Sequence, residues 1–221
     1  MKWGELKLAT MQTIFANEGP NLSEDDSNQD YLQMMPAKTN EALQQACVVR
    51  PLVKKWTVTV SADAQQETVE PGVSVTLPVQ QGLYHLDMTV LVPRFRAIHD
   101  GEVMLDSGGV YGYAEEWQIE GDTTLVIPGE TVGEYTVFYR AYPQTIDATT
   151  EDSVEIDVPA EVAHLLPLYI ASELYKDDDL AMATMWRNEW EDGLEKVRQA
   201  YDESADGAFR AEMRHSTTGW W

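Results

Sequence analysis

The hydrophobic period of this 221-residue chain changes twice, and this pattern most constrains its fold. Apolar residues recur at helical spacing up to Val49, alternate with polar residues from Trp56 onward, and return to helical spacing after Val158. A sequence with the helical period does not form a stable strand, and one with the alternating period does not form a stable helix. The two ends and the middle of the chain must therefore fold differently. We therefore expect an α+β protein, in which a small helical bundle is interrupted by an inserted antiparallel β-sandwich.

The pattern divides the chain into three parts. Residues 1–55 and 151–202 are expected to form one discontinuous helical bundle, residues 56–150 the inserted sandwich, and residues 203–221 a C-terminal docking tail. The first helix carries Leu6, Ala9, Met11, Ile14 and Phe15 at roughly helical spacing and should stop at Asn17–Pro20. A second helix is expected from about Asn28 to Val49, and Pro36 should bend or divide it.

The middle part contains short β-rich runs separated by turn signals such as Glu70-Pro-Gly72 and Pro128-Gly129. The runs predicted as strands are Trp56–Val60, Val73–Leu77, Thr124–Ile127 and a longer one, Leu83–Val92. The segment Thr124–Ala141 resembles the corner between the fifth and sixth strands of immunoglobulin-like and fibronectin-III-like sandwiches. In that corner a tyrosine such as Tyr135 bonds its hydroxyl back across the turn. The alternative is an ordinary hairpin that carries a tyrosine.

The C-terminal part predicts a hairpin of two helices with facing apolar stripes. Pro159 marks the first helix start, and Asp177-Asp-Asp179 should cap the second. The first stripe consists of Val162, Leu165, Leu166, Tyr169, Ile170 and Leu174. The second consists of Met182, Met185, Trp186, Trp190, Leu194, Val197 and Tyr201.

The charge of the chain excludes several kinds of partner. Lys and Arg number 15 against 38 Asp and Glu, a formal net charge of −23. Residues 1–55 are near neutral, so the acidity lies in the sandwich and the C-terminal helices. Such a surface repels phosphate and anionic lipid, which argues against nucleic-acid or membrane-surface binding.

Membrane insertion and disulfide formation are also not expected. No stretch approaches the ~20 apolar residues of a membrane span. The N-terminus lacks a signal-peptide core, so we expect synthesis and retention in a reducing cytoplasm until the protein joins a larger assembly. The single cysteine, Cys47, lies in an apolar helical context and is expected to be a buried, inert thiol.

No motif predicts an enzyme, a cofactor or a metal site. The histidines His85, His99, His164 and His215 are scattered without ligand spacing. Glu115 and Glu116 would point to opposite faces of a strand, which makes them poor partners for glycoside hydrolysis. The neighbouring aromatic residues Tyr111, Tyr113 and Trp117 could bind a sugar or could belong to the core.

The C-terminal tail is the one candidate binding segment. Its anchors and their basic neighbours are Phe209, Arg210, Met213, Arg214, Trp220 and Trp221. Tryptophan is a frequent interface anchor and is costly to leave in water, so the tail either docks into another subunit or folds back on its own core.

Four segments resemble one known family. Trp3–Lys7 and Met35–Leu43 look like the N-terminal helices of tailed-phage neck proteins, and Val162–Asp179 with Ala183–Glu191 is similar to the helical hairpin of head–tail connector (adaptor) proteins. The resemblance covers a little over two-fifths of the chain. These are packing motifs and contain no catalytic residues.

The resemblance implies a non-enzymatic protein of the virion neck, synthesised in the host cytoplasm. Proteins of this family form rings, usually of twelve subunits, beneath the portal protein. Such a ring contacts the portal and further neck or tail proteins, and DNA passes through it without specific binding. On this chain the portal-binding role would fall on the segment after Tyr201.

The inserted sandwich departs from simple adaptors. It leaves a second hypothesis open, in which a carbohydrate-binding or adhesin-like decoration protein of the virion acts through the sandwich. A third hypothesis is a hydrolase whose site has no visible motif.

Overall fold

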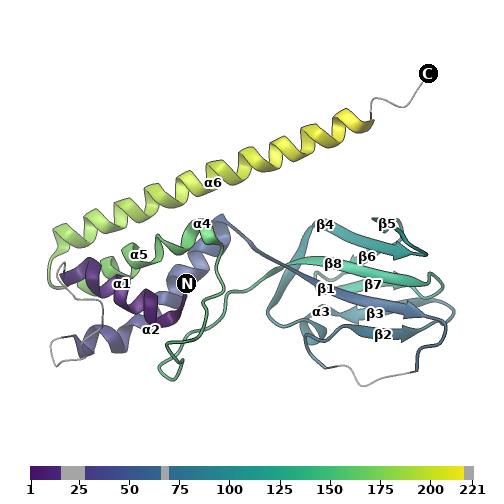
Figure 1. Cartoon of the computed structure of the whole chain (residues 1–221), viewed down its shortest axis with the longest axis horizontal. Coiled ribbons are helices and arrows are strands. Elements are labelled where there is room, and N and C mark those ends of the chain that lie inside the picture. The colour runs from purple at the N-terminus through teal and green to yellow at the C-terminus, as the bar shows by residue number, and fades with distance from the viewer. Residues whose placement is uncertain (16–27, 66–69, 217–221) are drawn as a thin grey trace. The chain divides into compact units, whose positions relative to one another are not determined.

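The computed structural model describes residues 1–15, 28–65 and 70–216, and for residues 204–216 it describes the backbone alone. The chain divides into two compact units, which are considered one at a time. The helical unit contains Met1–Pro51 and Pro143–Trp221, and the β unit contains Leu52–Tyr142. The architecture is α+β, as the two changes of period predicted (Figure 1).

The helical unit is built from helices at both ends of the chain. They are α1 (Trp3–Phe15), α2 (Gln29–Val49), α4 (Ala160–Ala163), α5 (Leu166–Tyr175) and α6 (Leu180–Ser216). Pro36 lies inside α2 without dividing it. The predicted stop of the first helix at Asn17–Pro20 and the acidic loop that follows lie outside the described residues.

The core of the helical unit follows the predicted stripes closely in α5 and less closely in α6. Every member of the Val162–Leu174 stripe is buried, and so are Trp186, Trp190 and Leu194. Two predicted members of the second stripe are not in the core, because Met182 and Met185 are 38% and 44% exposed. The buried position at that level of α6 is Ala183, whose small side chain allows close packing.

The cap predicted for the last helix is confirmed. The Asp179 carboxylate accepts hydrogen bonds from the backbone N–H groups of Ala181 and Met182, at 2.9 and 3.1 Å, and so caps α6. His164 is the C-cap of α4, so it lies at a helix boundary. Cys47 is buried in α2, as expected.

The β unit consists of two sheets, each with one buried face. The larger sheet has the order β2-β1-β8-β4-β5, formed by β1 (Leu52–Ser61), β2 (Val75–Pro78), β4 (Phe95–Ser107), β5 (Val110–Tyr113) and β8 (Gly133–Ala141). The smaller has the order β3-β7-β6, formed by β3 (Leu83–Asp87), β6 (Gln118–Glu120) and β7 (Thr124–Pro128). All pairings are antiparallel except that of β1 with β2.

Burial alternates along β1 from Trp56 onward and along β3, so each of the two sheets has a strand with one buried face. Val58, Tyr135 and Leu105 occupy one row across β1, β8 and β4, and the first two are at most 1% exposed. In the smaller sheet, Leu86 and Leu125 are paired and buried. The side chains in these rows therefore face the other sheet. Two sheets that face each other in this way form a β-sandwich.

The connection from β7 to β8 passes between the two sheets, as the immunoglobulin-like corner does. Tyr135 is 1% exposed at the start of β8, and its side chain interacts with Thr131 in the turn. When β3 to β8 are assigned to strands B, C, C′, D, E and F, the sheets become B-E-D and C′-C-F, and β1 occupies the place of strand G. The strand order is thus that of an immunoglobulin sandwich whose last strand comes first in the chain.

This order brings the two ends of the β unit together. Leu52, the first residue of β1, pairs with Ala141, the last residue of β8. Paired Cα atoms of antiparallel strands lie about 4.5–5.5 Å apart. The chain therefore enters and leaves the β unit at neighbouring points, so the helical unit is interrupted by only a short gap.

Two local predictions in the β unit were wrong. Leu83–Val92 is not one long strand, because β3 ends at Asp87 and the short helix α3 (Met88–Leu91) follows. The Asp87 carboxylate accepts the backbone N–H of Thr89 at 2.9 Å and so starts the helix. Glu115 and Glu116 do not lie on a strand but in the bend between β5 and β6.

Candidate functional site

The described residues contain no cluster of three or more His, Cys, Asp or Glu side chains placed to hold a metal ion. His85 lies against Glu120 at 3.2 Å, and His99 lies against Asp100 at 3.6 Å. The side chain of His215 lies outside the description.

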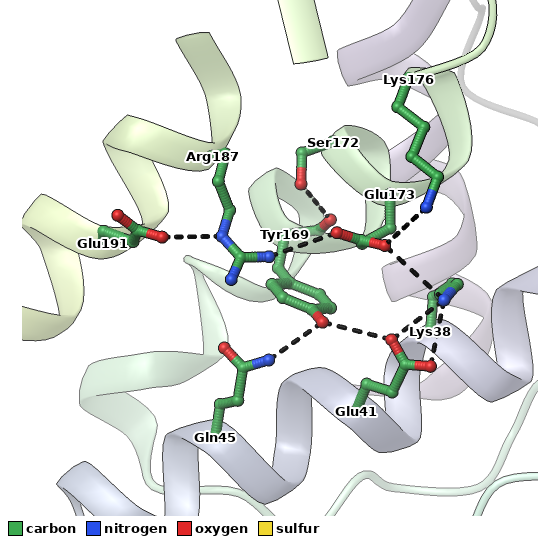
Figure 2. Close-up of polar contacts among 9 residues, drawn as sticks. All are labelled: Lys38, Glu41, Gln45, Tyr169, Ser172, Glu173, Lys176, Arg187 and Glu191. Carbon is green, nitrogen blue, oxygen red and sulfur yellow. Dashed lines mark hydrogen bonds and ion pairs between the residues drawn. The ribbon is translucent and has the colours of Figure 1, made fainter. Parts of the chain in front are cut away.

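A polar network joins three helices of the helical unit at its surface (Figure 2). The Glu173 carboxylate on α5 lies 3.6 Å from Lys38 Nζ on α2, 3.3 Å from Lys176 Nζ and 3.3 Å from Arg187 Nη1 on α6. Lys38 also contacts Glu41 at 3.0 Å. One carboxylate thus connects α2, α5 and α6.

Tyr169 lies at the centre of this network. Its hydroxyl accepts a hydrogen bond from Gln45 Nε2 at 3.0 Å and donates one to Glu41 Oε2 at 3.2 Å. The Arg187 guanidinium lies 4.8 Å from the centroid of its ring. Burial raises the pKa of Tyr169, and the nearby carboxylates of Glu173 and Glu41 raise it further. The hydrogen bond of Lys38 to Glu41 raises the pKa of Lys38, so this ammonium group stays charged at neutral pH.

Sequence reasoning missed this network as a whole. The part that was visible is local, since Lys38 and Glu41 are three residues apart and Arg187 and Glu191 are four apart. The contacts that join the helices connect residues far apart in the chain, such as Lys38 with Glu173.

Helix α6 continues well past the residues that it packs into the core. Among the described side chains of α6, Leu194 is the last that is buried and Val197 the last that packs partly buried against the core. The helix backbone continues to Ser216, and Figure 1 shows it extending past α5. Its exposed middle is stabilised from within, because Arg198 binds Glu195 at 2.7 Å and Asp202 at 3.3 Å. The hydrogen bond from Arg198 lowers the pKa of Glu195 to about 2. Val197 still packs against the core and the Tyr201 ring contacts Arg50, so we call the stretch of α6 from Tyr201 to Ser216 the arm.

A groove of about 650 Å³ lies where α6 crosses α4. Gly193 of α6 packs closely against Leu165 in this groove, since a Cβ atom added to Gly193 would lie 2.7 Å from Leu165 Cδ2. At one end the Arg50 guanidinium lies 4.6 Å from the centroid of the Tyr201 ring and 3.8 Å from Glu161. The groove is bordered by charges of both signs, among them Glu189, Asp192 and Lys196.

The start of α6 presents an apolar surface. Leu180 is 71% exposed, and the exposed Met182 and Met185 follow on the same helix. Their spacing suggested core residues, so this surface was not predicted. Flexible methionine side chains are common at surfaces that contact partners.

The predicted binding residues occupy the far end of the arm. Phe209, Arg210, Met213 and Arg214 lie in the last turns of α6, where the backbone alone is described. Trp220 and Trp221 lie outside the described residues. The role assigned to these six residues therefore stays a prediction.

The comparisons with known proteins identify one family. A family model described as SU10 adaptor protein matches residues 1–212. The matched span encloses the β unit as well as the helical unit and ends before Trp220. No curated protein matches the chain. Within the described ranges, no helix is long and apolar enough to cross a bilayer.

Proposed function

The chain belongs to the SU10 adaptor protein family of structural phage proteins, and on this premise we propose that it joins the portal to the tail in the virion neck. The family membership suggests portal and tail proteins as partners and the virion as the location. Its members are structural proteins, not typically enzymes. The proposal adds that the protein works as a ring of identical subunits, twelve by analogy with the connector proteins that it resembles.

The observation that carries this proposal is the arm formed by α6. Its backbone stays helical to Ser216, 15 residues beyond Tyr201, whose ring contacts Arg50 of the bundle. The arm bears apolar residues at helical spacing, with Tyr201, Phe209 and Met213 among them. An amphipathic helix without a partner exposes apolar surface, which favours burial against another protein.

We assign the portal contact to the end of this arm and the segment after it. The proposed anchors are Phe209, Arg210, Met213, Arg214, Trp220 and Trp221. Aromatic and arginine side chains dominate the energetics of protein interfaces. The remaining surface of α6 and the groove beside it would then contact neighbouring subunits, because a closed ring needs two different complementary faces on each subunit.

The charge of the chain suits a ring that encircles DNA. With a net charge of −23, the protein does not release counterions from the phosphate backbone, so it does not hold passing DNA. The near-neutral segment of residues 1–55 is the part best suited to pack against other subunits.

The test is co-sedimentation with the purified portal protein. The full chain should bind, a chain ending at Tyr201 should fold but not bind, and a chain ending at Ser216 should bind more weakly because it lacks Trp220 and Trp221. A matched control is Tyr142→Ala, which removes an exposed aromatic side chain of the β unit. Equal binding by the full chain and the chain ending at Tyr201 would refute the assignment of the anchors.

A further inference from the structure

The two outer strands of the larger sheet carry no charged residue. The strand at one edge, β2, reads Val-Thr-Leu-Pro, and the strand at the other edge, β5, reads Val-Tyr-Gly-Tyr (Figure 1). The outer strands of the smaller sheet differ, because β3 carries Asp87 and β6 carries Glu120. Charged side chains on an edge strand oppose its pairing with another chain. The larger sheet lacks this protection at both of its edges.

Apolar side chains are exposed at both of these edges. On β5, Val110 is 74% exposed and Tyr111 is 56% exposed, and the two side chains lie on opposite faces of the sheet. The residues that flank β2, Val73 and Val79, are 53% and 40% exposed. Within the described part of the chain, no strand pairs with the outer side of β2 or β5. Each edge therefore presents its backbone and apolar surface to a further strand.

The hydrogen-bond pattern shows which backbone groups of β5 point away from the sheet. Directly after β5, the backbone N–H of Ala114 donates to the carbonyl oxygen of Val103 at 2.8 Å. Hydrogen-bonded pairs alternate along antiparallel strands, so Gly112 and Val110 are the residues of β5 that bond to β4. The backbone N–H and C=O of Tyr111 therefore point outward, where an added strand would bond to them.

The two edges are complementary in direction. The strands β1 and β2 are parallel, whereas the pairs β1–β8, β8–β4 and β4–β5 are antiparallel. As a result, β5 runs opposite to β2. If a second copy lies beside the first in the same orientation, its β2 is antiparallel to β5, which is the more stable kind of pairing. Because the two edges are different surfaces, this contact can repeat from copy to copy, as a ring requires.

The faces of the sheet also match at such a contact. One row of paired residues crosses the whole sheet, and its members are Tyr111, Asp106, Glu134, Thr59 and Thr76. Side chains of one row lie on one face. A second copy in the same orientation would continue this row, with its Thr76 beside Tyr111. The two carboxylates of the row lie in its middle, so they do not meet the neighbouring copy.

From this geometry we propose that β5 of each copy pairs antiparallel with β2 of the next copy in the ring, so that the larger sheet continues from subunit to subunit. The inference rests on the proposed neck ring and adds the β unit to the contacts of α6. The added strand would bond to the backbone of Tyr111 and cover Val110. Pro78 has no N–H group, so the pairing would be confined to Val75–Leu77 of β2.

A symmetric dimer through β5 alone fits the sheet less well. It would leave the uncharged edge at β2 without a partner. A contact between two identical surfaces is also complete with two copies and cannot repeat around a ring.

The experiment is cysteine cross-linking of the full chain bound to the purified portal protein. Tyr111→Cys and Thr76→Cys are prepared separately, mixed and treated with a short bismaleimide. We expect a cross-linked dimer from the mixture and from neither variant alone. A chain that carries both substitutions should give a ladder of larger products. Adding Val110→Lys to Tyr111→Cys should lower the yield about tenfold, because a charge on an edge strand opposes pairing.

The matched control is Gln118→Cys, which places an exposed cysteine on β6 of the smaller sheet. Its mixture with Tyr111→Cys should give no product. The unsubstituted chain should give none either, because its single cysteine, Cys47, is buried. Circular dichroism checks that each variant is folded.

Two outcomes would overturn the inference. One is a cross-linked dimer from Tyr111→Cys alone, which would show that β5 pairs with β5. The other is no product from the mixture although both chains co-sediment with the portal, which would leave the neck role intact. The mixture is also treated at high concentration without the portal. A failure of portal binding would then count against the neck role, and the cross-links would still decide the strand pairing.

Discussion

Glu173→Gln tests whether the polar network fixes α6 on the bundle. The change keeps the shape of the side chain and removes the charge that Lys38, Lys176 and Arg187 share (Figure 2). The Glu173 side chain is 21% exposed, Lys38 19% and Arg187 34%, so the contacts between helices are partly shielded from water. The contact with Lys176, which is 48% exposed, is largely solvated.

The expected loss follows from these exposures. A hydrogen bond to a charged group contributes about 1.5–3 kcal/mol, and a solvated ion pair about 0–1 kcal/mol. Part of the loss is offset, because Lys38 keeps Glu41 and Arg187 keeps Glu191 as partners. We therefore expect Glu173→Gln to lower the free energy of unfolding of the helical unit by about 1–2 kcal/mol. Lys176→Gln, the matched control, should lower it by less than about 0.5 kcal/mol.

The assay is urea denaturation followed by far-ultraviolet circular dichroism, which reports mainly on the helical unit because α3 is the only described helix of the β unit. The loss caused by Glu173→Gln should shrink at high salt, since the shared charges are partly screened. If Glu173→Gln costs no more than Lys176→Gln, the carboxylate does not hold the three helices together, and the reasoning fails.

Three further predictions concern the fold. Gly193→Leu should destabilise the helical unit by about 1–3 kcal/mol in urea denaturation, because its Cβ would lie 2.7 Å from Leu165 Cδ2; a neutral or stabilising effect, as helix propensity alone predicts, would contradict the tight crossing. The Tyr31 hydroxyl donates to Asp178 at 2.6 Å, and burial with this hydrogen bond raises the pKa of Tyr31 from 10.0 to about 12. The folded state thus favours the neutral form of the Tyr31 hydroxyl. The contribution of this hydrogen bond to the stability of the fold is therefore complete below about pH 10 and is lost as the pH rises toward 12. A spectroscopic titration should show several tyrosines with a raised pKa, among them Tyr169, and Tyr31→Phe should remove the one that titrates near pH 12; an unchanged titration would contradict the contact. Replacing residues 52–142 by a linker of about three residues should leave a folded helical unit, because Leu52 and Ala141 are paired neighbours; loss of its helical circular dichroism would show that the two units fold as one.

Long apolar stripes made the fold class predictable from the sequence. Every member of the Val162–Leu174 stripe is buried, because a helix that places apolar residues every three or four positions has only one face to bury. The same rule failed at Met182 and Met185, which lie beside the packed face of α6. Which apolar residues become buried depends on how wide the partner surface is, and spacing alone does not contain that information.

Local hydrogen bonding explains the wrong strand prediction. Leu83–Val92 has a composition typical of a strand, yet Asp87 caps a helical turn within it. The strand order of the sandwich and the pairing of β1 with β2 could not be predicted from the sequence either, because they depend on contacts between residues far apart in the chain. The corner at Tyr135 was predictable because its residues are adjacent in the chain.

The candidate surfaces were predictable only in part. The pairs Lys38–Glu41 and Arg187–Glu191 are visible in the sequence, but the carboxylate of Glu173 that joins their helices is not. Tyr113 and Trp117 stood out as aromatic residues near acidic ones.

The most direct test of the neck role is an electron cryo-microscopy map of the assembled particle. We expect a closed ring of this protein directly beneath the portal, with the end of α6 and the segment of residues 217–221 inserted against the portal. A map in which this protein occurs only on the capsid surface or on a fibre, with the ring beneath the portal formed by another protein, would contradict it.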